Sequence, residues 1–302
     1  MVWYDRFKNR IAIKSPIGRA FLAEILGTCL LCAFGNGSVA QSVLSNKEMG
    51  TYISVNWGYG LGAAMGVFVS TGASGGHLNP AVSLAMAVLG KLRWRYLPAY
   101  VIAQTIGSFL SSILVYFVYL DGLNNFDGGN RSVTGPLATA GIFSTYPLDH
   151  VTWATGLGDQ IVGTMLLVIC VLAVTDHKHG VNPSSGLVPV IVGFIVFLLG
   201  ISFGYNCGYA INPARDLGPR IFTAIFGWGL ETFSFRNYNW FWIPLIGPLI
   251  GGLLATVVYP LVIGIHLDNE VNDELVDIDE VKFSCSSLSY CTESNETDLT
   301  KL

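Results

Sequence analysis

The sequence predicts an all-α integral membrane protein with six transmembrane helices, two re-entrant half-helices and an inverted internal repeat. The chain has 302 residues, of which 52% are hydrophobic and only 12% are charged, whereas soluble domains carry about 25% charged residues. An Asn-Pro-Ala motif also occurs twice, and a polar pentapeptide that precedes it repeats as well. This composition excludes an ordinary soluble domain, and nothing in it indicates nucleic-acid binding.

Six long apolar segments predict the membrane spans. They cover residues 18–42, 52–71, 96–120, 155–176, 186–204 and 240–266, and each approaches the length that a bilayer core of about 30 Å requires. Residues 1–17 are basic and lack the apolar core and cleavage site of a signal peptide, so we expect a cytoplasmic N-terminal segment that is not cleaved.

The duplicated motif predicts two short helices. Asn79-Pro80-Ala81 and Asn212-Pro213-Ala214 each place Asn, a strong N-cap, before Pro at the first helical position. The first pattern ends at Gly90 and the second fades near Gly227. Neither helix is long enough to cross a bilayer at 1.5 Å per residue. Half-spans in matching places indicate a polar pathway, because irregular backbone at membrane depth lines a cavity or is buried in protein.

The two halves of the chain repeat each other beyond these motifs. Glu24-Ile25-Leu26-Gly27-Thr28 matches Gln160-Ile161-Val162-Gly163-Thr164, and each pentapeptide stands at a similar distance before its Asn-Pro-Ala motif. Three spans per repeat place the second copy upside down in the membrane. We therefore expect the half-helices to enter from opposite faces and their N-termini to meet near the midplane.

This arrangement has a chemical consequence for anything that passes the two helix N-termini. Each N-terminus carries about half a positive charge, which opposes cations and protons but not neutral solutes. The side-chain amides of Asn79 and Asn212 can donate hydrogen bonds to a solute. The unwound backbone before them is expected to supply acceptors, namely the carbonyl groups of Gly75, Gly76, His77, Tyr209, Ala210 and Ile211.

The paired motifs, the duplication and the six-plus-two layout resemble the aquaporin superfamily. Asp216 directly after Arg215, followed by Arg220, Pro244 and Leu245, resembles its glycerol-conducting branch, the aquaglyceroporins. The resemblance implies a channel domain over residues 18–266, with one repeat at about 18–120 and the other at about 155–266. It also implies a homotetramer with one pore in each subunit.

The resemblance further implies a selectivity filter formed by Arg215, Tyr59, Gly200 and Tyr209. Such a filter suits glycerol, since the two tyrosines would face its carbon atoms and Arg215 would donate to its hydroxyl groups, while Gly200 would supply width. The branch more often has Phe or Trp in place of Tyr59, and the extra hydroxyl is expected to narrow or hydrate the filter. Without the resemblance, aromatic packing at an interface between helices would be the favoured interpretation of either tyrosine.

Three polar residues are interpreted as scaffold. Glu24 lies inside the first span, where we expect it to brace the re-entrant loop rather than to relay protons, and Gln160 is its counterpart in the second repeat. Asp216 lies in the first turn of its half-helix and four residues before Arg220, where both the helix dipole and the ion pair are favourable. We expect it to hold Arg215 aside without contacting solute.

Two residues near the pathway have alternative interpretations. His77 precedes Asn79 by two residues and is either a pH sensor or, as we favour, a neutral hydrogen-bonded wall residue. Cys207 is the one cysteine expected near the outer vestibule; it has no obvious partner and is interpreted as a free thiol that mercurials could reach. No disulfide framework, metal site or cofactor is expected.

The distribution of charge predicts the topology. Most Lys and Arg residues lie in the segments assigned to the cytoplasm, which predicts that both termini are inside. We expect the membrane to be the plasma membrane. Opposite them lies the loop 121–155 with the N-glycosylation sequon Asn130-Arg131-Ser132. Residues 267–302 are acidic and rich in Ser and Thr, which predicts a disordered cytoplasmic tail, with phosphorylation as an alternative role.

The favoured function is a passive channel for water, glycerol and similar small neutral solutes across the lipid bilayer. The alternatives are a water-selective channel and a secondary transporter, because inverted repeats with broken helices also occur in transporters. A transporter would need an ionisable coupling group at the midplane, where the sequence offers only Arg215. An enzyme is not expected, since zinc-ligand spacing, a nucleophile elbow and a phosphate loop are all missing.

Overall fold

The computed structural model describes residues 3, 7, 11–176, 178 and 183–267, and these residues form a bundle of helices without strands. The predicted tail at 267–302 falls almost wholly outside the described residues. The long helices are α2 (Pro16–Leu44), α3 (Tyr52–Ser74), α5 (Leu97–Val118), α7 (Trp153–Thr175), α8 (Val188–Phe203) and α11 (Ile243–Val262). They correspond in order to the six predicted spans.

Four of these helices are long and apolar enough to cross a membrane by length and composition. They are α2, α5 together with the preceding η1 (Trp94–Tyr96), α7, and α11 together with η3 (Gly264–His266). Helix α8 is apolar but has only 16 residues, whereas α3 has 23 residues that include several glycines and Asn56. All-helical membrane architecture is thus confirmed.

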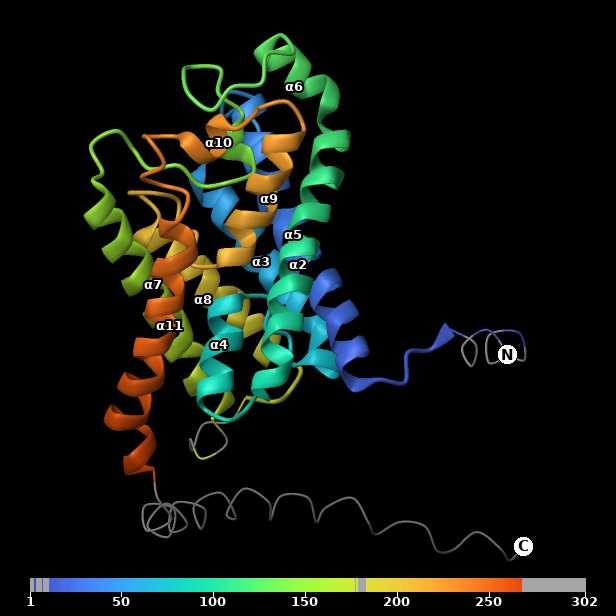
Figure 1. The fold of residues 1–302 in the computed structure, drawn as a ribbon, viewed down its shortest axis with the longest axis vertical. Helices are drawn as coiled ribbons and strands as arrows, with labels where there is room; N and C mark the ends of the chain where they lie inside the picture. Colours follow the sequence, from blue (N-terminus) through green and yellow to red (C-terminus); the bar gives the residue numbers. More distant parts are fainter. Residues whose placement is uncertain (1–2, 4–6, 8–10, 177, 179–182, 268–302) are drawn as a thin grey trace, which may run out of the picture.

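Two half-helices occupy the interior of the bundle. They are α4 (Pro80–Val88) and α9 (Pro213–Ile225), and Figure 1 shows α4 in the lower half and α9 in the upper half, between the long helices. Each packs more extensively on the last span of the opposite repeat, α4 on α11 and α9 on α5, than on its own. This exchange ties the repeats together around the pathway.

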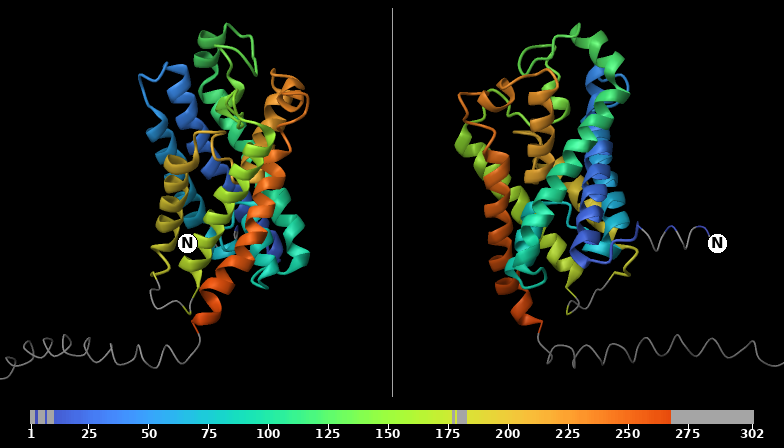
Figure 2. Two further views of the ribbon diagram at one scale, coloured as in Figure 1. Left: turned by 90° about the vertical axis from the view of Figure 1, so that its left-hand side faces the viewer. Right: turned by 45° about the vertical axis from the view of Figure 1, so that its right-hand side comes forward.

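The inverted repeat is visible in equivalent helix contacts. A Cβ atom added at Gly107 of α5 would lie 2.3 Å from the Ile25 carbonyl oxygen of α2, and one added at Gly251 of α11 would lie 2.2 Å from the Ile161 carbonyl oxygen of α7. Each glycine therefore permits the first and last spans of its repeat to touch, as small residues do in membrane helix pairs. The start of α2 and the end of α11 lie toward the same end of the bundle (Figures 1 and 2).

The connections contain helices that the sequence analysis did not predict. Two of them lie in the connection predicted as a loop at 121–155: α6 (Leu120–Asp127) forms its first part and η2 (Ala140–Ile142) lies further along it. The third, α10 (Glu231–Ser234), precedes α11. These pieces are short, and α6 and α10 are polar, so neither apolar length nor periodicity identified them. Helix α10 packs against α9, whereas α6 and η2 contact α2. The segment around Thr145, which follows η2, is bonded to Asp216 of α9.

Candidate pore and its constriction

The N-termini of α4 and α9 meet and are joined by two reciprocal hydrogen bonds. The Asn79 side chain donates from Nδ2 to the Ile211 carbonyl oxygen at 2.8 Å, and Asn212 donates from Nδ2 to the Leu78 carbonyl oxygen at 2.8 Å. Each asparagine also caps its own helix, since its Oδ1 accepts from Ala81 N or from Ala214 N. The meeting of the half-helices that the sequence predicted is therefore present in the fold.

These hydrogen bonds reduce the number of donor and acceptor groups that remain available to a solute. One N–H of each Asn amide is already used, which leaves one N–H per amide. The Ile211 carbonyl, predicted as a solute acceptor, accepts from Asn79, and the Leu78 carbonyl was not anticipated at all. Leu78, Tyr209 and Ile211 have positive φ angles of 53°, 39° and 40°, which non-glycine residues seldom adopt. Such backbone needs support from its surroundings.

Glu24 supports the first loop. Its side chain is fully buried, and its Oε1 accepts from Ser74 Oγ at 2.5 Å and from His77 N at 3.0 Å. Its Oε2 accepts from Leu78 N at 2.8 Å and from Gln104 Nε2 at 2.7 Å. All four bonds are internal, so the geometry is that of a brace.

Gln160 supports the second loop at the equivalent place. Its Oε1 accepts from Ile211 N at 2.8 Å, just as Glu24 accepts from Leu78 N. Its Nε2 lies 3.1 Å from the Cys207 sulfur, which in turn lies 3.2 Å from Asp159 Oδ1. Cys207 is a free cysteine, as predicted, but its thiol is buried and lies within hydrogen-bonding distance of both side chains.

Two cavities lie along the pathway, one beside the junction of the half-helices and one beyond it. The lower cavity, on the side of α4 in Figure 1, has a volume of about 520 Å³ and is lined by the unwound segment 75–79 together with apolar side chains such as Val82, Met86 and Val192. The upper cavity has a volume of about 470 Å³ and is lined by residues that include Thr51, Gly141 and Cys207. Tyr59, Tyr209 and Arg215 line both cavities, so these three side chains form the constriction between them.

Aromatic and cationic groups meet at the constriction. The rings of Tyr59 and Tyr209 stand edge to face with centroids 6.1 Å apart, and the Arg215 guanidinium lies 4.6 Å from the Tyr59 centroid. Arg215 donates from Nη1 to the Phe143 carbonyl oxygen at 3.2 Å and from Nη2 to the Tyr59 hydroxyl. Each of the three residues is at most 7% exposed. The arrangement offers aromatic faces beside fixed N–H donors.

Gly200 differs from its expected role. It lines neither cavity, and a Cβ atom added to it would lie 2.7 Å from Tyr209 Cζ and 2.6 Å from Asn56 Oδ1. Its missing side chain thus makes room for the Tyr209 ring instead of leaving open lumen. The expectation that the Tyr59 hydroxyl would narrow or hydrate the filter also changes, because this hydroxyl bonds to Asn36 and Arg215.

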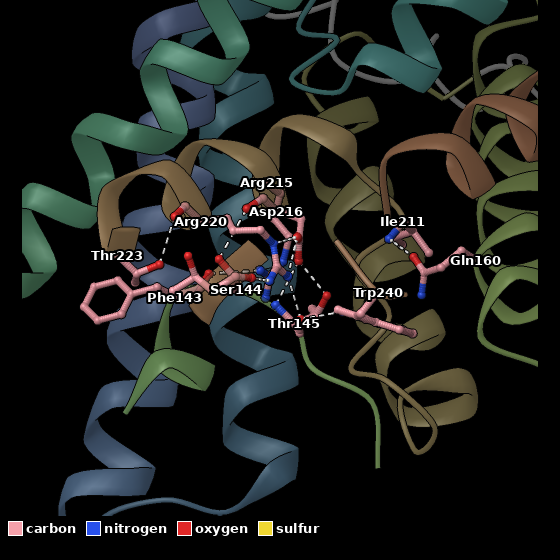
Figure 3. A network of polar contacts seen from close by, with 11 residues as sticks. Phe143, Ser144, Thr145, Gln160, Ile211, Arg215, Asp216, Arg220, Thr223 and Trp240 are labelled. Carbon is pink, nitrogen blue, oxygen red and sulfur yellow. Dashed lines mark hydrogen bonds and ion pairs between the residues drawn. The ribbon is translucent and has the colours of Figure 1, made fainter. Parts of the chain in front are cut away.

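Asp216 and Arg220 of α9 form hydrogen bonds with Thr145, which lies in the loop between α6 and α7 (Figure 3). The Arg220 Nη2 atom lies 2.7 Å from Asp216 Oδ1 in a fully buried ion pair. Asp216 Oδ2 accepts from the backbone and the hydroxyl of Thr145, and Arg220 donates back to the Thr145 carbonyl oxygen at 2.7 Å. Thr145 follows Phe143 by two residues, so this pair positions the carbonyl that accepts from Arg215. No direct hydrogen bond joins Asp216 to Arg215 in this network.

The remaining predicted residues lie around this framework. His77 lines the lower cavity, and its Nδ1 lies 3.1 Å from Ser83 Oγ. Asn130 is exposed just after α6, which is a requirement for the predicted N-glycosylation. Pro244 is buried in the first turn of α11 and Leu245 is half-buried beside it, and neither lines a cavity.

Sequence reasoning missed several residues that hold the site. Gln104 and Asn36 are polar side chains inside predicted spans, and their presence at membrane depth was a usable signal. The carbonyl oxygens of Leu78 and Phe143 carried no signal, because backbone acceptors have no side-chain signature and their partners lie far away in sequence.

Half-helices that meet at their N-termini within a membrane bundle, with a cavity on each side of a polar constriction, define a pore-forming membrane protein. The chain belongs to the major intrinsic protein family, whose model matches residues 12–259. It is 50% identical over 268 residues to aquaporin-10 of Milnesium tardigradum, an alignment that spans 84% of this chain and 65% of that protein.

Other relatives match over nearly their whole length. Human aquaporin-9 is 45% identical over 260 residues, which cover 86% of this chain and 88% of that protein. The X-ray structure of the aquaglyceroporin from Plasmodium falciparum superimposes with a TM-score of 0.75 at 30% identity, covering 83% of this chain and 99% of the other. Family membership and the aquaglyceroporin resemblance are thus confirmed.

Proposed function

We propose that this protein is a passive channel for water, glycerol and similar small neutral solutes. The observation that carries the proposal is the constriction of Tyr59, Tyr209 and Arg215, which lines both cavities next to the junction of α4 and α9. The family supports a channel, and the relatives that are named aquaglyceroporins support glycerol as a solute. A channel of this family is not expected to be an enzyme.

The geometry accounts for selection among solutes. A glycerol molecule presents carbon atoms along one side and hydroxyl groups along the other, which suits the ring faces of the tyrosines beside the free N–H groups of Arg215. Beyond the constriction, the remaining N–H groups of Asn79 and Asn212 can donate hydrogen bonds to the same glycerol hydroxyl groups. Cations are opposed by Arg215 and by the positive ends of α4 and α9.

Two observations separate this proposal from a coupled transporter and from water selectivity. Among the described residues, neither cavity is lined by an Asp or a Glu that could carry a coupling proton. The lower cavity also presents a mainly apolar wall, which suits the carbon atoms of a polyol better than water alone. We further propose a homotetramer in the plasma membrane with both termini in the cytoplasm, as family resemblance and the Lys and Arg bias suggest.

Reconstitution in liposomes tests the function. Vesicles that contain the wild-type protein should shrink in a glycerol gradient and then reswell quickly, as followed by light scattering. They should shrink without reswelling in sucrose. Rapid shrinkage in glycerol without accelerated reswelling would show a water-only channel and would contradict glycerol conduction.

Arg215→Ala should weaken the exclusion of cations. A unit charge at about 4 Å contributes about 4 kcal/mol at an effective dielectric constant of about 20, so we expect the sodium leak to rise by at least about tenfold. A potential-sensitive dye measures the leak in the same vesicles. Arg93→Ala removes an exposed charge outside the cavities and is the matched control. Equal leaks in both variants would rule out Arg215 as the barrier.

Glycosylation at Asn130 tests the orientation. The protein expressed in a eukaryotic secretory membrane should lose mass on treatment with a glycosidase specific for N-glycans, and Asn130→Gln should run at the deglycosylated mass. Asn130 is exposed shortly after α6, and Figure 1 shows α6 at the end of the bundle opposite the start of α2. An unmodified wild type whose N-terminus is accessible from outside would reverse the proposed topology.

A further inference from the structure

The two tyrosines of the constriction have hydroxyl groups in different surroundings. The Tyr59 hydroxyl donates to Asn36 Oδ1 at 2.6 Å and accepts from Arg215 Nη2. The Tyr209 hydroxyl is buried and has no protein partner among the described residues. The Tyr59 hydroxyl therefore cannot donate a hydrogen bond to a solute, since Asn36 Oδ1 already accepts its single proton.

The burial of Asn36 does not by itself explain why a polar residue occupies this position. It lies on α2, is completely buried and lines neither cavity. Its Nδ2 has no hydrogen-bond partner in the part of the chain that the structure describes, which destabilises the fold because this group loses its water without a replacement. An apolar side chain of similar size would avoid that penalty, so the bond to Tyr59 is the one polar contact that explains an asparagine here.

The residue before Asn36 shapes the same contact. A Cβ atom added to Gly35 would lie 2.1 Å from Cε1 of the Tyr59 ring, so only glycine lets the ring rest against α2. This close approach brings the hydroxyl to Asn36. Gly35 and Asn36 thus form a seat for Tyr59, with contact along the ring edge and a hydrogen bond at its end.

The seat also determines the position of Arg215. The guanidinium lies over the Tyr59 ring, and its two Nη atoms donate to the Tyr59 hydroxyl and to the Phe143 carbonyl oxygen. Both acceptors hold the planar group against the wall of the constriction. The N–H groups that remain free then have a fixed direction, which is the condition for discriminating solutes by hydrogen bonds.

We propose that Asn36 is a positioning residue of the filter, which acts through the Tyr59 hydroxyl to hold Arg215 against the wall and keep the constriction wide enough for a polyol. This inference rests on the proposed glycerol conduction. Without Asn36, the Tyr59 hydroxyl must donate elsewhere and no longer presents a fixed acceptor. Arg215 then turns toward the lumen for a partner, which hinders glycerol more than the smaller water molecule.

A double-mutant cycle on the ratio of glycerol to water permeability tests this inference. Asn36→Leu removes the acceptor at similar volume and should lower the ratio about fivefold, the factor that corresponds to one net hydrogen bond. Tyr59→Phe should lower it to a similar extent. In the Tyr59→Phe background, Asn36→Leu should have no further effect, because residues that act through one contact are not additive.

Equal effects of Asn36→Leu in both backgrounds would overturn the inference, as would an unchanged ratio in the single variant. Asn36→Ala tests the same bond should the leucine variant fail to fold. Thr28→Val is the matched control, because Thr28 is an equally buried residue of α2 whose hydroxyl also lacks a partner. A fivefold loss in this control would attribute the effect to α2 packing and would refute the role of Asn36.

A cryo-EM structure of the Asn36→Leu variant separates this inference from the proposed function. Loss of the contact between Arg215 and Tyr59 would support it, and a retained contact would overturn it, whatever solutes the wild type conducts. Failure of the wild type to conduct glycerol would refute the proposed function and the effect on polyol width, but not the positioning of Arg215 by Asn36.

Discussion

Glu24→Ala should abolish glycerol flux and destabilise the protein by about 2–6 kcal/mol, since the backbone N–H groups of His77 and Leu78 lose their acceptor. The carboxylate accepts four internal hydrogen bonds, two of them from the backbone of the loop before Asn79. Its removal leaves buried donors without partners, at about 1–3 kcal/mol each. The strained backbone at Leu78 then loses its support, and with it the carbonyl that fixes Asn212. Thermal unfolding in detergent and flux in liposomes measure the two effects.

Glu24→Gln is the informative companion to this variant. An amide keeps one acceptor oxygen, and Gln160 shows that a glutamine can hold the equivalent backbone N–H in the second repeat. We expect intermediate stability and measurable flux. A brace needs acceptors, whereas a proton relay needs an ionisable group, so normal flux in Glu24→Ala would exclude the brace and abolished flux in a stable Glu24→Gln would favour a relay.

Asp216→Ala should lower stability by about 3–5 kcal/mol, because it leaves the Arg220 charge buried without its partner. It also releases the backbone N–H of Thr145 and thereby the nearby Phe143 carbonyl that accepts from Arg215. The ratio of glycerol to water permeability should therefore change together with the melting temperature. Paired measurements in detergent and in liposomes show whether the two effects occur together.

Asp127→Ala is the matched control for this variant. Asp127 and Arg131 form a second ion pair with the same four-residue spacing, its side chains are nearly as buried, and it lies between α6 and the loop that follows. Its loss should lower the melting temperature while leaving the permeability ratio unchanged. A changed ratio in Asp127→Ala, or an unchanged ratio in Asp216→Ala, would contradict the proposed link between Asp216 and the filter.

Local features of the amino-acid sequence were enough to predict the architecture. Apolar length predicted the order of the six long helices, and N-cap chemistry at Asn79 and Asn212 predicted where α4 and α9 begin. The repeated pentapeptides predicted that Glu24 and Gln160 would occupy equivalent places. These features could be recognised because each depends on residues close together in the chain: helix length, capping and periodicity are local properties.

Which polar groups remain free at the constriction depends on contacts between segments that are far apart in the sequence. Asn36 and Tyr59 are 23 residues apart, and Tyr59 and Arg215 are 156 apart, so no local pattern reveals their bonds. Gly200 was predicted to widen the filter, but the Tyr209 ring and the Asn56 side chain occupy the space beside it. Cys207 looked isolated until packing brought Asp159 and Gln160 to it. A donor is available to a solute only when no protein acceptor lies beside it. The packing of helices that are distant in sequence determines which acceptors lie there.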